Sequence, residues 1–168
     1  MFGKVAMLLR TFNQLKKLPV YLVNSTDVSV LGSIEDLLFD QIGEIKGFKI
    51  DVKGFLQRDH FLPFTVPFLL EEEGLIIYSR DDLMPMTADV KSYYSMEQRH
   101  AMMGKPVVSE DGEQLGLVKD VYFQEHAGTI EGIEMTEGWF TDMTEGLKQI
   151  KFHSGLSVQN DILIVKNT

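Results

Sequence analysis

Histidines are the first candidates for chemistry in this chain, and there are four of them: His60, His100, His126 and His153. None has another histidine, or a cysteine, at the spacing that metal sites use. His126 follows Glu125 in a predicted turn, and together they offer at most two ligands. The chain has no cysteine, so thiolate chemistry and disulfides are excluded. We expect neither a metal nor another cofactor.

A cation, an acid and a base stand side by side at Arg58-Asp59-His60. Adjacent residues of a strand point to opposite faces, so these groups would not converge on one substrate, and a solvated hairpin tip is favoured. The run Glu71–Glu73 before Gly74 predicts a charged turn, because a Ca²⁺ loop needs acids at alternate positions. No glycine-rich phosphate loop and no Gly-x-Ser-x-Gly elbow occurs. The sequence therefore predicts that the protein is not an enzyme.

The segment EGWFTDMTEG at 137–146 offers a binding surface instead. Trp139 and Phe140 follow a glycine, and two interpretations stay open. They form either a plug in a barrel core or an aromatic anchor for a partner, with Asp142 and Glu145 as its polar rim. We hypothesise a protein-docking surface here.

The chain contains an internal repeat. LGSIEDLLF at 31–39 returns as LGLVKDVYF at 115–123, 84 residues later. With small shifts, the alignment continues through these pairs: Gly43 with Gly128, Gly47 with Gly132, Gly54-Phe55-Leu56 with Gly138-Trp139-Phe140, and Phe68 with Phe152. A solenoid needs several stacked units, so a two-fold repeat predicts two small domains of one kind.

Short apolar runs between turn residues such as Glu110–Gly112 predict that each copy is a small β-barrel. The apolar positions change parity around Asp36 and Asp120, which requires one inserted residue, a β-bulge. A short acidic side chain there can accept hydrogen bonds from unpaired backbone N–H groups. Gly47 and Gly132 interrupt strands at equivalent places and mark a further bend. We assign these residues to the strand bends.

The stretch 80–103 has no visible counterpart in the repeat. Ser95 and Gln98 fit a capping box, which predicts a short helix there. The predicted division of the chain is a first barrel at 7–80, a connector at 81–101 and a second barrel at 102–168. Because the repeated residues identify the fold, we expect function where the copies differ: in the connector, the turn at 24–29 and the Trp139 loop.

The formal net charge of −9 is shared by both copies: residues 1–90 carry 9 basic and 13 acidic residues, and the rest carry 7 and 12. Direct nucleic-acid binding is not expected, because it needs clustered positive charge. Apolar residues at helical spacing within the basic stretch 1–17 are compatible with a helix on a membrane surface. The alternative is that Met7 onward enters the first barrel and residues 1–6 form a loose leader. No transmembrane run and no signal peptide is found.

The pattern Gly104-Lys105-Pro106-Val107, Asp111-Gly112 and Leu115–Val121 resembles the PRC-barrel family. The first copy is more divergent and keeps Leu18-Pro19-Val20 and Leu31–Leu37. The family includes the cytoplasmic domain of the photosynthetic reaction-centre H subunit and the C-terminal domain of a ribosome maturation factor. The resemblance implies an all-β fold of two PRC-type barrels in tandem, with a short, partly helical connector.

For function, the resemblance implies a non-catalytic adaptor that binds a protein partner, in the bacterial cytoplasm or at the face of a membrane. An accessory factor in RNA processing or ribosome assembly, acting through protein contacts, is the alternative. A homo-oligomer is also left open. Fold alone does not decide between these roles.

Overall fold

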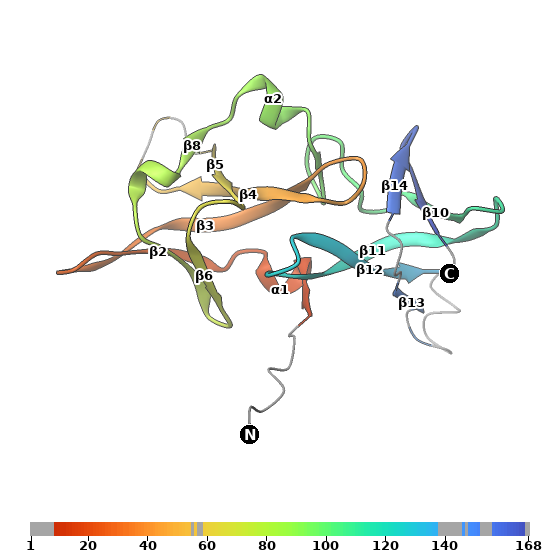
Figure 1. The fold of residues 1–168 in the computed structure, drawn as a ribbon, viewed down its shortest axis with the longest axis horizontal. Helices are drawn as coiled ribbons and strands as arrows, with labels where there is room; N and C mark the ends of the chain where they lie inside the picture. The colour runs from red at the N-terminus through yellow and green to blue at the C-terminus, as the bar shows by residue number, and fades with distance from the viewer. Residues whose placement is uncertain are drawn as a thin grey trace.

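The computed structural model describes residues 9–54, 56, 59–137, 146, 148–151 and 156–166, and the backbone alone for 148–151. Two sheets account for most of these residues, one for each repeat (Figure 1). The first repeat runs from red to green at the left of Figure 1, and the second runs from cyan to blue at the right. The observed class is all-β, as the sequence predicts.

The first sheet has the strand order β6-β7-β2-β3-β4-β5-β8, with β9 paired to β3 in addition. Its strands are β2 (Pro19–Val23), β3 (Val28–Phe39), β4 (Ile45–Val52), β5 (Asp59–Pro63), β6 (Phe68–Glu71), β7 (Gly74–Ile77), β8 (Met84–Pro85) and β9 (Tyr94–Ser95). A 3₁₀ turn η1 (Arg80–Asp82) and the helix α2 (Ala88–Lys91) lie between β7 and β9.

The second sheet has the order β13-β12-β11-β10-β15-β14, with β1 paired to β11 in addition. Its strands are β1 (Arg10–Thr11), β10 (Pro106–Ser109), β11 (Gln114–Gln124), β12 (Thr129–Thr136), β13 (Lys148–Lys151), β14 (Leu156–Gln159) and β15 (Ile162–Val165). The helix α1 (Phe12–Leu15) follows β1. Both sheets contain one parallel pair, β2 with β7 and β10 with β15, which shows that they share one topology.

Each of the long strands β3 and β11 pairs, along part of its edge, with a short strand that leads into the other repeat. The first half of β3 pairs with β2, and its last residues, Leu38 and Phe39, pair with β9. The first half of β11 pairs with β10, and Tyr122 and Phe123 pair with β1. β1 leads into the first repeat and β9 leads into the second, so the two leading segments are crossed. We call residues 9–15 the first arm and residues 94–98 the second arm.

The two arms are equivalent to each other. Thr11 accepts a hydrogen bond from the backbone N–H of Gln14 at 3.3 Å, and Ser95 accepts one from the N–H of Gln98 at 3.1 Å. The next residue of each arm, Phe12 or Met96, is fully buried. The structure thus supplies a counterpart for part of the stretch 80–103, which has no partner in the repeat as aligned from the sequence. The short helix predicted at Ser95–Gln98 is wrong: these residues close a turn after β9, because the Ser95 side chain accepts the N–H of Gln98 while Asp36 accepts the N–H groups of Glu97 and Gln98. The connector does contain a helix, α2, but it lies earlier in the chain.

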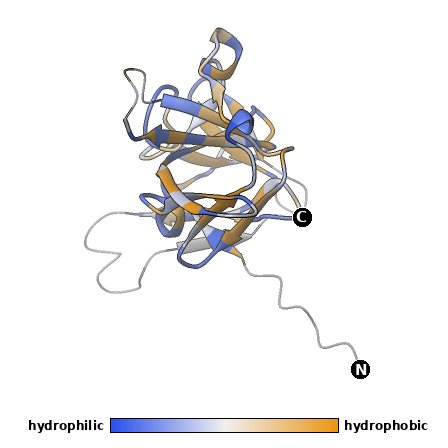
Figure 2. Cartoon of the chain, turned by 90° about the vertical axis from the view of Figure 1, so that its left-hand side faces the viewer, coloured by the Kyte–Doolittle hydropathy of each residue, from blue (hydrophilic) through white to orange (hydrophobic). Residues whose placement is uncertain are grey.

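The two repeats pack through a nearly two-fold interface. The N–H of Ile45 donates to the carbonyl oxygen of Gly128 at 2.8 Å, and the N–H of the equivalent Ile130 donates to the carbonyl oxygen of Gly43 at 2.9 Å. Such reciprocity is the mark of an isologous contact. Buried apolar side chains from both sheets and from α1 form one continuous cluster, and Figure 2 shows hydrophobic residues concentrated in the strands of both sheets.

The turns follow the sequence predictions, but part of the alignment does not. Glu110–Gly112 joins β10 to β11, and the Glu71–Glu73 stretch lies at the turn between β6 and β7. Phe68 pairs with the last residue of β7, as Leu156 pairs with the last residue of β15. Phe68 is therefore equivalent to Leu156, and its alignment with Phe152 is wrong because the second copy is longer before β14.

Candidate functional site

Asp36 lies at a register shift between β3 and β4, where the pairing moves between Ile34 and Asp36. Its side chain is fully buried. It accepts hydrogen bonds from four backbone N–H groups: those of Leu37 and Met96 at 2.8 Å, Gln98 at 3.1 Å and Glu97 at 3.2 Å. Burial raises the pKa of Asp36 above its usual value, although these hydrogen bonds oppose the rise. The carboxylate therefore fastens the second arm to the first sheet.

Asp120 lies at the equivalent register shift between β11 and β12. It accepts the N–H of Val121 at 2.8 Å and that of Asn13, in α1, at 3.3 and 3.4 Å. Burial raises the pKa of Asp120, and the negative charge of Glu134 raises it further. Asp120 therefore fastens the first arm to the second sheet, as Asp36 does for the second arm.

Gly47 and Gly132 lie opposite a second register shift in each repeat. Gly47 pairs with Leu38 just before the shift to Phe39, and Gly132 pairs with Tyr122 just before the shift to Phe123. A Cβ atom on Gly47 would lie 2.2 Å from the carbonyl oxygen of Leu62. The backbone of β5 thus approaches this position too closely for any side chain.

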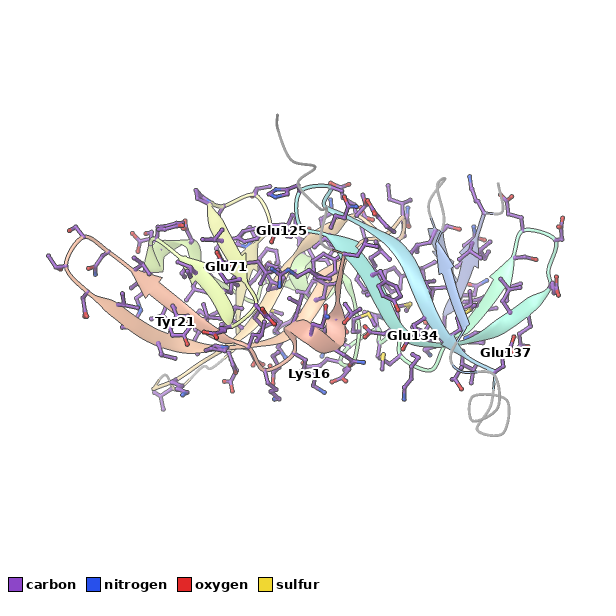
Figure 3. The ribbon with its side chains drawn as sticks, turned by 90° about the horizontal axis from the view of Figure 1, so that it is seen from below. Lys16, Tyr21, Glu71, Glu125, Glu134 and Glu137 are labelled. Atoms are coloured by element: carbon purple, nitrogen blue, oxygen red, sulfur yellow. The ribbon has the colours of Figure 1, made fainter. Side chains whose placement is uncertain are left out.

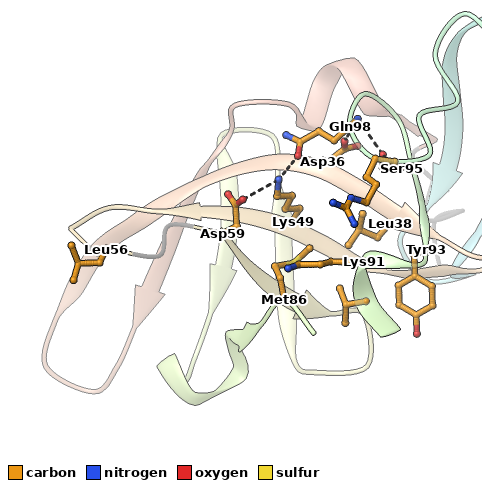
Figure 4. Close-up of a pocket in the computed structure, with 12 residues that line it drawn as sticks. Asp36, Leu38, Lys49, Leu56, Asp59, Met86, Lys91, Tyr93, Ser95 and Gln98 are labelled. Carbon is orange, nitrogen blue, oxygen red and sulfur yellow. Dashed lines mark hydrogen bonds and ion pairs between the residues drawn. The ribbon is translucent and has the colours of Figure 1, made fainter. Parts of the chain in front are cut away.

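A cleft of about 560 Å³ opens beside Asp36, between the first sheet and the chain that runs through α2 (Figure 4). Apolar side chains line one part of it: Leu38, Leu56, Met86, Val90 and Tyr93. Leu38 and Val90 are buried in a small cluster with Phe61, and Met86 and Tyr93 pack against this cluster. We call this site the connector cleft.

Lys49 is the most enclosed cation of the connector cleft, with only 12% of its side chain exposed. Its Nζ lies 3.3 Å from Asp59 and 3.4 Å from Glu35, and it donates to Gln98 of the second arm. Figure 4 shows the side chain held between Asp59 and Gln98. Lys49 is thus neutralised within the chain.

Lys91 and Arg99 line the same cleft and are exposed. Neither forms an ion pair with any residue that the structure describes. Two unpaired cations next to an apolar surface are suited to a ligand that carries both a negative charge and an apolar group. Function is expected in the connector from the sequence, but nothing in the sequence singles out these two residues. They come to line one cleft with Leu38 only when α2 folds back over the first sheet.

The second repeat has different side chains at the equivalent positions. Tyr122 replaces Leu38, and Glu134 replaces Lys49. The hydroxyl of Tyr122 donates to Glu134 at 2.9 Å, and burial, followed by this carboxylate, raises the pKa of Tyr122 to about 12. Figure 3 shows Glu134 on the second repeat, far from Tyr21 of the first. At these two described positions the second repeat therefore lacks the leucine and the lysine that line the connector cleft.

The three histidines that the structure describes do not form a cluster. The ring of His100 lies edge-on to Tyr94 at 6.0 Å, and His126 lies 3.6 Å from Glu125 at an exposed turn. His60 belongs to β5, and His153 lies outside the described residues. Across the described part of the chain, no group of three or more histidine, aspartate or glutamate side chains is arranged to hold a metal ion.

Two of the predicted binding regions fall wholly or partly outside the described residues. The predicted docking residues Trp139, Phe140, Asp142 and Glu145 are among those not described, as are residues 1–8 of the predicted membrane helix. In the described part of that helix, Phe12 and Leu15 are fully buried in the shared core and do not face outward. None of the described helices is long and apolar enough to cross a membrane.

The comparisons with known proteins agree with this geometry. The model of the PRC-barrel domain matches residues 9–84 and again residues 96–168. The chain belongs to the PRC-barrel family. The two matches begin at the two arms, so the tandem PRC-barrels predicted from the sequence are confirmed. The chain is also similar to YrrD of Bacillus subtilis (strain 168), a protein described as uncharacterized, with 31% identity over 160 residues that span 94% of this chain and 87% of the relative.

Proposed function

We propose that this tandem PRC-barrel is a non-catalytic docking protein, and that its connector cleft binds an acidic, partly apolar segment of a protein partner. The observation that carries the proposal is the pair of exposed cations, Lys91 and Arg99, beside an apolar surface and without an ion pair in the described chain. A carboxylate of the partner would neutralise them while an apolar side chain covers Leu38 and Met86.

The state of the buried acids supports a role without catalysis. A buried carboxyl with a raised pKa is often an acid or base in an active site. In Asp36, however, the carboxylate oxygens are already engaged by four backbone N–H groups. These bonds fix the second arm and leave the carboxyl poorly placed to exchange a proton with a substrate.

The charge of the chain makes the cleft selective. Because the protein carries a net charge of −9, most of its surface repels an acidic partner. Lys91 and Arg99 are a local exception to this repulsion, because they place two positive charges in the connector cleft. Binding there should weaken as salt rises, since exposed charges are screened beyond about 10 Å at ~0.1 M salt.

The test compares the wild-type chain with a Lys91→Glu/Arg99→Glu variant and a matched Lys53→Glu/Lys119→Glu control, whose exposed cations lie outside the cleft. A protein captured from the native cell by the wild type is purified, and its affinity for all three chains is measured by calorimetry. We expect at least a tenfold loss with the cleft variant and less than a threefold loss with the control. Equal affinity for the cleft variant and the wild type would refute the cleft as the docking site.

The same variants test the alternative function, in which the protein is a ribosome-associated factor. Co-sedimentation with ribosomes at low and at high salt would reveal such an association. If the chain sediments with ribosomes and the cleft variant does so equally well, the proposed cleft plays no part in that association.

A further inference from the structure

The first arm makes most of its ordered contacts with the second repeat, although it leads into the first. Arg10 and Thr11 pair with Phe123 and Tyr122 of β11. The backbone N–H of Asn13 donates to Asp120. Phe12 is fully buried in the shared core. The second repeat therefore supplies the strand edge and the carboxylate that receive a short strand followed by one helical turn, while the guanidinium of Arg10 donates to the carbonyl oxygens of Leu70 at 2.9 Å and Glu71 at 3.5 Å in the first repeat.

The first arm is tied to its own repeat by a short hinge, Lys16-Lys17-Leu18. Lys17 has a φ of 72°, a left-handed conformation that is unfavourable for a residue other than glycine. The hinge is held by a bond from the N–H of Lys17 to the carbonyl oxygen of Ile34 at 2.8 Å. Short hinges under strain are the sites at which chains exchange identical elements.

A second copy of the chain offers the same receptor. The edge of β11, the carboxylate of Asp120 and the apolar hole for Phe12 would be identical in that copy, so an arm that moved across would recover every contact except those of the hinge. The fold already uses this kind of exchange internally, because the second arm occupies the equivalent receptor on the first repeat.

We propose that two copies of the chain associate by exchanging first arms, so that residues 9–15 of one copy occupy the β11 and Asp120 receptor of the other. Exchange in both directions closes the assembly as a two-fold dimer and leaves no receptor empty. The fraction of dimer rises with protein concentration and with any change that opens the hinge.

The chain has no native cysteine, which permits a direct test by cross-linking. Thr11 and Tyr122 are directly paired across β1 and β11. One full-length chain carries Thr11→Cys and another carries Tyr122→Cys; the two are mixed at high concentration, incubated and oxidised. The dimer predicts a covalent product containing one chain of each kind. A chain carrying both changes serves as the positive control for the geometry, since it closes an internal disulfide when the arm lies on its own second repeat.

Hinge variants provide a second readout that does not depend on cysteine. Lys17→Gly relieves the left-handed strain and should lower the dimer fraction in light scattering by severalfold. Lys17→Pro forbids the closed hinge, because proline fixes φ near −65°, and should raise the dimer fraction by severalfold. The proposal is overturned if the wild type and Lys17→Pro remain monomeric at all concentrations. It is overturned equally if dimers form but the mixed cysteine variants cross-link no more than a Ser29→Cys and Tyr122→Cys mixture, whose positions lie on different sheets.

Discussion

Asp36 and Asp120 stand at equivalent bulges of the two repeats, and each carboxylate binds the arm that leads into the other repeat. The crossing joins the two barrels through hydrogen bonds that neither barrel could make alone. It also explains why acidic side chains occupy positions that are 0% and 3% exposed. Each carboxylate accepts hydrogen bonds from backbone N–H groups that would otherwise be buried without a partner.

Removing either carboxylate should destabilise the whole chain. Asp36→Ala leaves four backbone donors without their acceptor and should lower the free energy of unfolding by about 3–5 kcal/mol, whereas Asp120→Ala, whose bonds to Asn13 are longer, should lower it by about 1–3 kcal/mol. Urea unfolding measures both. Glu110→Ala, in an exposed turn, is the control and should change little. An equal, small effect of both aspartate variants would contradict the assigned role.

The raised pKa values of Asp36 and Asp120 predict the direction of the pH dependence. The folded chain holds protons on these carboxyls at pH values at which the unfolded chain, near the ordinary pKa of 3.8, has already released them. Their ionisation therefore lowers the free energy of unfolding as pH rises from 3.8 through the folded pKa, and acidification over the same interval restores it.

Urea unfolding of the wild type and of Asp36→Asn/Asp120→Asn between about pH 4 and about pH 7 isolates this contribution. The wild-type value minus the variant value should decrease as pH rises. A difference that grows with pH would mean that the N–H bonds outweigh burial and that the folded pKa values are lowered.

The shared core predicts that the two barrels unfold together. Ile34 in the first repeat and Ile133 in the second are both fully buried in the same cluster. Truncation of either to alanine should cost about 2–5 kcal/mol and should lower one common calorimetric transition. Two separate transitions, each shifted by only one variant, would show that the crossed arms do not couple the repeats.

Gly47 should tolerate no side chain, because a Cβ atom there would lie 2.2 Å from the carbonyl oxygen of Leu62 and 2.5 Å from the ring of Phe61. Gly47→Ala should cost about 3 kcal/mol through overpacking. The matched control is Gly112→Ala, at a turn with a φ of 85° and no atom within 4 Å of the added Cβ, where left-handed strain alone should cost about 1 kcal/mol. Thermal unfolding of the two variants checks the order.

Tyr122 should ionise at a higher pH than a tyrosine in water. Its pKa is raised to about 12 by burial and by the carboxylate of Glu134, whereas an ordinary tyrosine ionises near ~10. Ultraviolet absorbance after a rapid pH jump, recorded before unfolding, should show a phenol that ionises near pH 12. Tyr122→Phe should remove that step, and Glu134→Gln should move it to lower pH. If both variants titrate like the wild type, the late phenol belongs to another residue.

The strand bends could be predicted from the sequence because they depend on the order of apolar and polar residues within a short stretch of chain. The parity change around Asp36 and Asp120 reflects which side of a strand each residue occupies, and it predicts a bulge before any pairing is known. The turns at Glu110–Gly112 and at Glu71–Glu73 carry their own glycine and charge signals. Each of these features is specified within about ten residues.

The two arms could have been recognised in the sequence, but the strand edge that each arm joins could not. Thr11 with Gln14 and Ser95 with Gln98 carry the same capping pattern 84 residues apart. Unequal spacing before Pro19 and Pro106 hides the match. Even with the match in hand, a two-residue strand does not encode which edge it joins, so its crossing to the other repeat is a property of the assembled sheets.

The sequence by itself determined that this protein is a tandem of two bent-strand barrels, because apolar periodicity, bulges and turns are local properties of the chain. The tertiary structure decided that the arms are crossed and that Lys91 and Arg99 share a cleft with Leu38. Both relationships join residues that are distant in the chain. They exist only once α2 has folded over the first sheet and the two sheets have closed on one core.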